Sequence, residues 1–340
     1  MKKSVKNIIQ VLLGFVIGGY LLFITLKEQN FDEIVNSIRE TDIVWALMGG
    51  VSLLAVFLLR AYRWKIILNN SGIYPKTFDV INSIALGYFI NLFTPKFGEL
   101  VRCTNLKRTD NVKVSKVLGT VVSERVWDIL VLILGLIFVI LFEFDRIASL
   151  FNIQETFAGF KNSTLLFAVI LIALGALFLL SYKLLYKRIN HWKAVVYLAN
   201  FVKEIYTTVL LTFKIKKYKQ FLLLTLFIWI ALVSMNYCFL MSLHETDSSS
   251  IYFAVIVLFI GAIGWVIPTP AGVGSTHYFI LQLFLAFELS RSAGIHFGIL
   301  SNGLNFVYTL VVGIVALIYN EIRVFRIKKL QDINPEPIEE

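Results

Sequence analysis

Charged residues are scarce in this sequence, and their scarcity excludes an ordinary soluble domain. Only 16% of the 340 residues are Asp, Glu, Lys or Arg, whereas soluble domains carry about 25%. Hydrophobic residues make up 58% of the chain, 29 residues are Phe, and the mean hydropathy is +0.77. We therefore expect an all-α polytopic membrane protein.

Cysteine and histidine are also rare. The two cysteines, Cys103 and Cys238, stand in unrelated contexts and predict neither a disulfide framework nor a metal site. The four histidines do not cluster by spacing, so the sequence predicts no metal set, no cofactor and no catalytic constellation. We expect the protein not to be an enzyme, and we expect no nucleic-acid partner.

Six apolar runs are long enough to cross the hydrocarbon core of a bilayer. The first follows three lysines, is 19 residues long and lacks a small-residue cleavage signal, so it is interpreted as a retained signal anchor. The second is extended by Arg60 and Arg63, which are interpreted as side chains that snorkel to the membrane surface. The six runs are 8–26, 43–59, 117–142, 165–186, 221–243 and 295–319.

The basic residues predict the sidedness. Of the 32 Lys and Arg residues, 26 fall in five clusters, which the positive-inside rule assigns to the cytoplasm. We therefore expect a multi-pass protein of the cell inner (plasma) membrane with both termini cytoplasmic. The apolar stretch 78–93 has a basic cluster on each side, so it is expected to enter and leave from the cytoplasm as a re-entrant element over about 78–107.

A second ambiguous stretch covers about 251–290 and is expected to start and finish outside. Its centre, Pro268 to Gly274, reads P-T-P-A-G-V-G and breaks any helix. Two half-helices that meet at this tip would form an outer re-entrant hairpin, although two tilted full spans fit the same sidedness. The fold predicted is about six transmembrane helices plus two re-entrant broken-helix elements in an inverted repeat, a pattern typical of transporters.

The whole of 1–330 is expected to form a single integral membrane domain. Within it, apolar and basic positions alternate with helical period over about 191–215, which predicts an amphipathic helix on the cytoplasmic surface. The final residues, 331–340, form a polar tail with no predicted structure.

Ionisable residues beside or within the apolar segments mark the candidate site. Burying them in lipid costs at least a few kcal/mol each, so they predict function. A half-helix that begins near Gly98 or Gly274 would point free N–H groups at an anion such as a phosphate, and Arg102 would add a fork of donors. The candidate substrate-binding residues are Pro95, Gly98, Glu99, Arg102, Glu124, Arg125, Asp128, Pro270, Gly272, Gly274, His277 and Asn305.

Two of these residues have an alternative interpretation. His277 follows the second tip by three residues and is either a proton carrier or a satisfied polar group. Asn305 belongs to a polar stripe with Asn302 and Tyr308, which either faces an interior or supplies helix–helix hydrogen bonds.

Three motifs in order carry a resemblance to a known family. They are N-x3-P-x2-G-E-x2-R from Asn91, S-E-R-x2-D from Ser123, and P-x-P-x-G-x-G from Pro268. In this the chain resembles the lysylphosphatidylglycerol synthase transmembrane-region (flippase-like domain) family, as a stand-alone member without the soluble aminoacyl-transferase domain. Two positions depart from the family pattern: His277 stands where a glutamate is common, and the last helix has Asn302 and Asn305 where an arginine is frequent.

The resemblance implies a flippase-like protein that moves an anionic phospholipid or a polyprenyl-phosphate-linked lipid between leaflets. Its partners would be membrane lipids. Two rival hypotheses stay open at this point. One is a non-catalytic membrane partner of an envelope lipid or glycan biosynthesis enzyme, which would dock on the amphipathic helix; the other is an intramembrane lipid-modifying enzyme.

Overall fold

The computed structural model describes residues 3–27, 29–110, 112–144, 146 and 214–333, and these residues are helical throughout apart from short connections. The chain forms two compact units, residues 1–124 with 219–340 and residues 125–218. The predicted span 165–186 and nearly all of the predicted amphipathic helix lie outside the described residues.

Four helices in the described part are long and apolar enough to cross a membrane. Together with the absence of strands from that part, they confirm an all-α polytopic membrane protein. These helices are α3 (Ile43–Asn70), α6 (Val114–Phe142), α11 (Tyr218–Met241) and α14 (Arg291–Ile333). The other elements are α1 (Lys3–Leu26), α2 (Phe31–Arg39), α4 (Thr77–Phe93), α5 (Gly98–Asp110), α12 (Ile251–Val266), η1 (Pro270–Gly272) and α13 (Ser275–Ala286).

Local sequence accounts for where several helices begin. The side chain of Asp42 accepts hydrogen bonds from the N–H groups of Val44 and Trp45, and so caps α3. Ser250 caps α12 in the same way through the N–H of Phe253. These caps satisfy backbone donors that the first helical turn leaves free.

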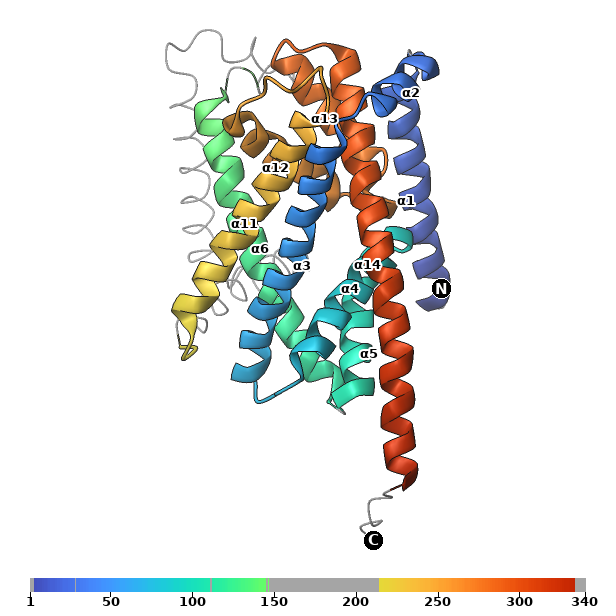
Figure 1. The fold of residues 1–340 in the computed structure, drawn as a ribbon, viewed down its shortest axis with the longest axis vertical. Coiled ribbons are helices and arrows are strands. Elements are labelled where there is room, and N and C mark those ends of the chain that lie inside the picture. Colours follow the sequence, from blue (N-terminus) through green and yellow to red (C-terminus); the bar gives the residue numbers. More distant parts are fainter. Residues whose placement is uncertain (1–2, 28, 111, 145, 147–213, 334–340) are drawn as a thin grey trace, which may run out of the picture. The chain divides into compact units, whose positions relative to one another are not determined.

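Helices α4 and α5 form a hairpin with a very short turn. The chain reverses at Thr94 to Phe97, where Pro95 cannot continue a helix and Lys96 takes a positive φ of 65°. The two helices approach so closely that a Cβ on Gly98 would lie 1.9 Å from the carbonyl oxygen of Gly87. Glycine at both positions therefore permits the contact between α4 and α5. Figure 1 shows these two helices side by side.

Helices α12 and α13 form a second hairpin, broken where the two prolines predicted it. The turn contains η1 and three residues with positive φ, namely Ala271, Gly272 and Gly274. Helix α1 packs against this turn, because a Cβ on Gly274 would lie 1.9 Å from the carbonyl oxygen of Gly18. A glycine-lined face of α1 thus packs against the turn of this hairpin.

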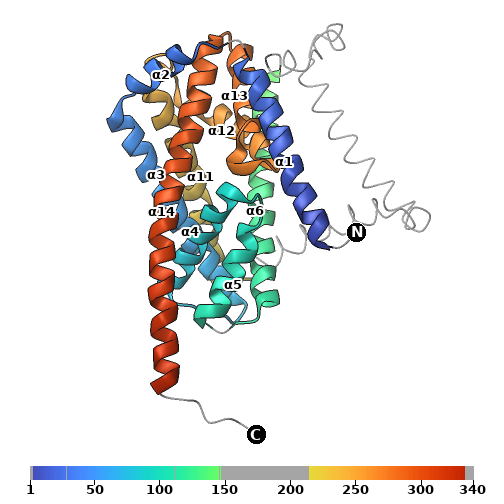
Figure 2. The ribbon, with the colours of Figure 1, turned by 90° about the vertical axis from the view of Figure 1, so that its right-hand side faces the viewer.

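The two hairpins start from opposite ends of the first unit. The N–H of Asp42, just before α3, donates to the carbonyl of Ser242 just after α11, so α12 starts from the end where α3 begins. Helix α4 starts from the other end, where α3 finishes. Figures 1 and 2 show α12 and α13 in the upper half of the view and α4 and α5 in the lower half. Helix α4 also lies against η1, so one hairpin touches the turn of the other.

In the second unit the structure describes residues 125–144, 146 and 214–218. These residues include the part of α6 that follows Glu124. Two short-range ion pairs stand out there. Arg125 contacts Asp128 at 3.4 Å, and Arg146 contacts Glu143 at 2.9 Å.

Candidate functional site

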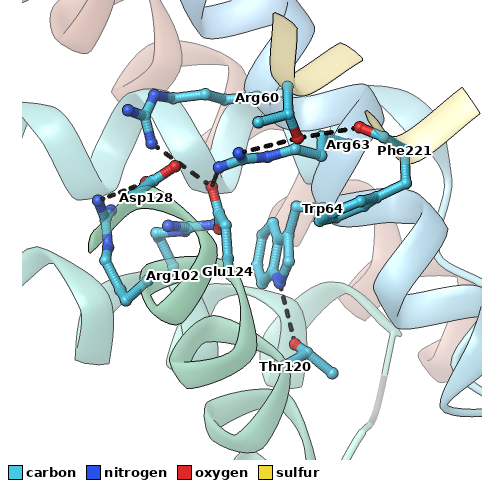
Figure 3. Close-up of polar contacts among 10 residues, drawn as sticks. Arg60, Arg63, Trp64, Arg102, Thr120, Glu124, Asp128 and Phe221 are labelled. Carbon is cyan, nitrogen blue, oxygen red and sulfur yellow. Dashed lines mark hydrogen bonds and ion pairs between the residues drawn. The ribbon is translucent and has the colours of Figure 1, made fainter. Parts of the chain in front are cut away.

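A single carboxylate gathers three arginines inside the first unit. Arg102 donates to Oε2 of Glu124 at 2.6 Å, and Arg63 donates to Oε1 at 3.4 Å. The guanidinium of Arg60 lies 3.7 Å from the same Oε1. Figure 3 shows the three side chains converging on Glu124 from α3 and α5. We call these four residues the arginine–carboxylate cluster.

The cluster lies deep in the protein and contains more guanidinium groups than carboxylates. Glu124 and Arg63 are 0% exposed, Arg102 is 2% exposed and Arg60 is 8% exposed. Guanidinium groups are the side chains best suited to phosphate, so a buried group of three arginines is a candidate anion site.

Helix geometry gives the distance of the cluster from the ends of α3 and α6. Arg60 precedes the end of α3 by ten residues, and Glu124 follows the start of α6 by ten. At a rise of about 1.5 Å per residue, both positions lie about 15 Å from their helix ends.

Arg102 is held from two sides but keeps donors that no described residue satisfies. Its guanidinium carbon lies over the ring of Trp64, 4.1 Å from the centroid. The indole N–H of Trp64 in turn donates to Thr120 Oγ1 at 2.9 Å. Nε and Nη1 of Arg102 are buried, and no hydrogen-bond acceptor for them exists among the described residues. These two donors are available to an anion.

The interpretation of Arg60 and Arg63 as snorkelling side chains is wrong. A snorkelling side chain reaches the surface, whereas both arginines are buried and face Glu124. Arg63 makes a second contact, from Nη1 to the hydroxyl of Thr225 on α11 at 3.4 Å. The sequence does contain a feature that indicates an acidic partner on another helix. Two arginines three apart share a helix face, and no acid near them in α3 balances their charge.

The other acids and the turn residues of the first motif take separate places. Glu99 lies half-buried in the first turn of α5. Pro95 lies in the turn, and Gly98 is buried where α5 begins, its N–H donating to Asn91 Oδ1 at 2.8 Å. In the second unit, Arg125 and Asp128 pair with each other, with side chains 34% and 13% exposed.

The residues of the second motif surround the start of α13. Gly272 and Gly274 are buried, and Pro270 opens η1. His277 is 5% exposed, and its Nδ1 accepts a hydrogen bond from the N–H of Gly274 at 3.3 Å. In this arrangement Nδ1 carries no proton, so His277 acts as a local cap of the helix that it belongs to.

The polar stripe on α14 makes mainly local and interhelical hydrogen bonds. The side-chain amide of Asn302 donates to the carbonyl of Ala271 at 3.0 Å, which ties α14 to the second turn. Asn305 accepts from Thr309 on the same helix at 3.3 Å. The hydroxyl of Tyr308 donates to the carbonyl of Ala46 on α3 at 3.0 Å.

A second buried ion pair was not predicted. Arg323 of α14 donates from Nε and Nη2 to the two carboxylate oxygens of Asp79 on α4, at 3.2 and 3.1 Å. Asp79 is 0% exposed, and the hydroxyl of Tyr319 lies 3.5 Å from its Oδ1. A two-point contact of this kind is strong and directional. It fastens the first hairpin to the last helix.

A polar cavity of about 260 Å³ lies at the end of the first unit where α3 begins. His296 is 4% exposed, and its Nδ1 lies 2.9 Å from Oε2 of Glu245. This contact joins the loop after α11 to the first turns of α14. The cavity is lined by Glu33, Asn36, Ser37, Glu40, His244, Glu245, Ser292 and His296.

Comparison with known proteins gives a family match over most of the chain. The family model of the lysylphosphatidylglycerol synthase TM region matches residues 11–313. A UPF0104 membrane protein of Pyrococcus horikoshii is 26% identical over 171 residues, which cover 43% of this chain and 51% of that protein. A UPF0104 membrane protein of Methanocaldococcus jannaschii is 25% identical over 142 residues, 41% of each chain. The match thus spans about half the length of these relatives or less, and no solved structure matches.

Proposed function

The chain belongs to the lysylphosphatidylglycerol synthase TM region family, and from this membership and the arginine–carboxylate cluster we propose that it moves an anionic lipid between membrane leaflets. The cargo would be an anionic phospholipid or a polyprenyl-phosphate-linked lipid. Both carry the same recognised group, a phosphate attached to a long apolar chain.

The observation that carries the proposal is the state of Arg102. This arginine is 2% exposed, pairs with Glu124 through Nη2, and has Nε and Nη1 without acceptors among the described residues. Leaving buried charged donors unsatisfied is unfavourable, and a phosphate oxygen is the acceptor that guanidinium donors fit best. Arg102 would therefore be the primary contact of the lipid phosphate.

The two hairpins support a transport role. They start from opposite ends of the first unit, and α4 of the first lies against the turn of the second. Interrupted helices of this kind in inverted repeats are typical of transporters with a site near the bilayer midplane. In the proposed cycle, the hairpins are re-entrant and open the cluster to one leaflet at a time, while both chain termini stay cytoplasmic.

The remaining predicted residues would serve this cycle by shaping and holding the hairpins. Asn91 and Gly98 fix the start of α5, four residues before Arg102. Asn302 and His277 hold the second turn through its backbone. Movement of either hairpin would change the surroundings of the phosphate without breaking the helices themselves.

The experiment is lipid translocation in proteoliposomes. Headgroup-labelled phosphatidylglycerol and a labelled polyprenyl phosphate are each followed for the unsubstituted protein, for Arg102→Ala and for Arg108→Ala. Arg108 is an exposed arginine on the same helix and serves as the matched control. Losing charge-assisted hydrogen bonds of about 1.5–3 kcal/mol predicts that Arg102→Ala lowers the initial rate at least about tenfold. Arg108→Ala is expected to leave it unchanged.

Two results would contradict the proposal. Movement that is equally fast in Arg102→Ala would show that the phosphate is held elsewhere. If neither lipid moves with the unsubstituted protein, the role of a non-transporting partner of an envelope enzyme gains support, and co-purification would then identify what binds.

A further inference from the structure

The polar cavity at the end of the first unit where α3 begins is built from three separate segments. Helix α2 gives four of its lining residues, the loop after α11 gives His244 and Glu245, and α14 gives Ser292 and His296. Figure 1 shows α2 beside the upper end of α14, and the two helices are in contact. Ile34 of α2 belongs to a buried apolar cluster with residues of α13 and α14, so α2 is fixed where it borders the cavity.

The lining of the cavity favours a cation. Glu33, Glu40 and Glu245 supply three carboxylates, and none of the described lining residues is Lys or Arg. A cleft lined by one sign of charge attracts ligands of the other sign. The whole chain has a formal net charge of +10, so the attraction of a cation to this place is local and is not a property of the protein as a whole.

The same lining favours a water-soluble ligand. All eight of its described residues are polar, including the hydroxyl groups of Ser37 and Ser292 and the side-chain amide of Asn36. Acyl chains need an apolar surface to leave water, and these residue types offer very little of it. The cavity therefore suits a small polar molecule better than a lipid.

His296 adds an open acceptor to the three carboxylates. It is the most buried of the lining residues, at 4% exposed. Its Nδ1 lies 3.0 and 2.9 Å from the two carboxylate oxygens of Glu245 and donates its proton to them. In the neutral ring Nε2 then has a lone pair and acts as an acceptor. This Nε2 is buried, and it has no hydrogen-bond partner among the residues that the structure describes.

We propose that the cavity binds a water-soluble organic cation with two or more ammonium groups, that is, a polyamine. One ammonium group donates to Nε2 of His296, and the others pair with the carboxylates of Glu33 and Glu40. An ammonium group carries three donors and no acceptor, which complements a lining of acceptors. The proposal goes beyond the movement of lipid and does not rest on it.

A bound polyamine would brace one end of the first unit. Its partners come from α2, from the loop that leads into α12 and from α14, so a single ligand ties three segments together. A ligand that binds only the folded protein raises the unfolding temperature. Binding and thermal stability therefore give two independent measurements of the same site.

The experiment is a calorimetric titration of spermidine, a molecule with three amino groups, into the purified full-length protein in a neutral detergent. The salt concentration is kept low, because salt screens the attraction between exposed charges. The unsubstituted protein is expected to bind spermidine saturably at one site, and its unfolding temperature is expected to rise with spermidine concentration.

Two exposed carboxylates on α2 provide variants that do not disturb the core. Glu33→Gln and Glu40→Gln are each expected to weaken spermidine binding about two- to fivefold, as for the loss of one exposed ion pair. Asp32→Asn removes the same charge from the same helix at an exposed residue outside the lining, so it is the matched control and is expected to leave the affinity unchanged.

The acceptor is tested by a substitution in α14. His296→Phe keeps an aromatic ring at the buried position and removes Nε2, so it is expected to weaken spermidine binding at least about tenfold, as for a lost hydrogen bond to a charged group. Circular dichroism checks that this variant is folded. If it is not, the two α2 variants and their control decide the case.

Two competitors separate a polyamine from other cations. Calcium chloride tests a metal ion, and phosphatidylethanolamine in mixed micelles tests an ammonium group carried by a lipid. Both are expected to displace spermidine poorly at equal concentration. Displacement by calcium that is stronger than binding of spermidine itself would assign the cavity to a metal ion, and strong displacement by the lipid would assign it to a headgroup.

The proposal is overturned if the unsubstituted protein does not bind spermidine, or if Glu33→Gln and Glu40→Gln bind it as tightly as Asp32→Asn does. Either result leaves the transport proposal standing. Absence of lipid movement in the proteoliposomes overturns the transport proposal and leaves the cation site unaffected, so the two failures are distinguishable.

Discussion

The guanidinium of Arg102 lies over the indole ring of Trp64, with its carbon 4.1 Å from the ring centroid. The ring belongs to α3 and the arginine to α5, so the contact joins the first hairpin to a transmembrane helix. The N–H of the same indole is fixed by Thr120 on α6 at 2.9 Å. Trp64 thus sets the position of Arg102 relative to Glu124, which is four residues after Thr120.

This relationship predicts different effects for two substitutions of Trp64. Trp64→Phe keeps an aromatic face beneath Arg102 and loses only the hydrogen bond, so lipid transport is expected to fall by less than about fivefold, the equivalent of about 1 kcal/mol. Trp64→Leu also removes the cation–π contact, worth about 2 kcal/mol at a desolvated site, and is expected to lower transport about thirtyfold further. Initial rates are compared at equal amounts of folded protein. Equal losses in the two variants would argue against a role for the ring face.

The pair formed by Asp79 and Arg323 predicts a measurable coupling between α4 and α14. Asp79→Asn, Arg323→Gln and the double variant form a cycle, and removing one partner of a buried pair leaves the other charge poorly compensated. We expect a coupling energy of about 1–3 kcal/mol in detergent unfolding. Arg326→Gln, one turn further along and exposed, is the control and is expected to change stability by less than about 0.5 kcal/mol. Strictly additive effects would contradict the coupling.

The broken helices could be predicted from the sequence because their causes are local. Pro95 removes a donor from any helix that tries to continue, and Pro268 and Pro270 do the same in the second hairpin. The structure ends α4 at Phe93 and α12 at Val266, just before these prolines. Glu124 stands in an otherwise apolar run of the sequence and is 0% exposed in the structure.

The partners of those ionisable residues could not be predicted, because they depend on which helix faces meet. Arg63 reaches Glu124 across 61 positions of sequence, and Asp79 reaches Arg323 across 244. Helical spacing shows that Arg60 and Arg63 share a face but not what that face contacts. The rule that explains basic residues near helix ends therefore assigned both arginines to the surface, although both are buried.

Close helix packing at the two hairpin turns predicts that alanine is not tolerated there. A Cβ on Gly98 would lie 1.9 Å from the carbonyl oxygen of Gly87, and one on Gly274 would lie as close to that of Gly18. Gly274 also has a φ of +83°, which alanine rarely adopts. Each alanine variant is expected to lose about 2 kcal/mol or more of stability, because a backbone has to move to make room.

The control for these glycines is the same substitution where space is open. Gly119 on α6 and Gly303 on α14 have no atom of the described residues within 4 Å of a new Cβ. Alanine in an exposed helix is favoured over glycine by about 0.5–1 kcal/mol, so these two variants are expected to unfold at slightly higher temperature. Thermal unfolding of the four variants by circular dichroism measures the contrast. Similar losses at all four positions would mean that steric contact is not the cause.

The two-way contact of Arg63 predicts that lysine cannot replace it. Its Nη1 donates to Thr225 Oγ1 and its Nη2 to Glu124 Oε1, both at 3.4 Å, which uses two separate nitrogen atoms of a planar group. An ammonium group is a single point of charge and would keep the contact with the carboxylate at the expense of the hydroxyl. Arg63→Lys is therefore expected to destabilise the protein by about 1–2 kcal/mol. Thr225→Val is expected to cost about the same, whereas Thr225→Ser, which keeps the hydroxyl, costs less. Combining Arg63→Lys with Thr225→Val is expected to cost no more than either change alone, since the same interaction is lost once, and a fully additive double variant would contradict the shared contact.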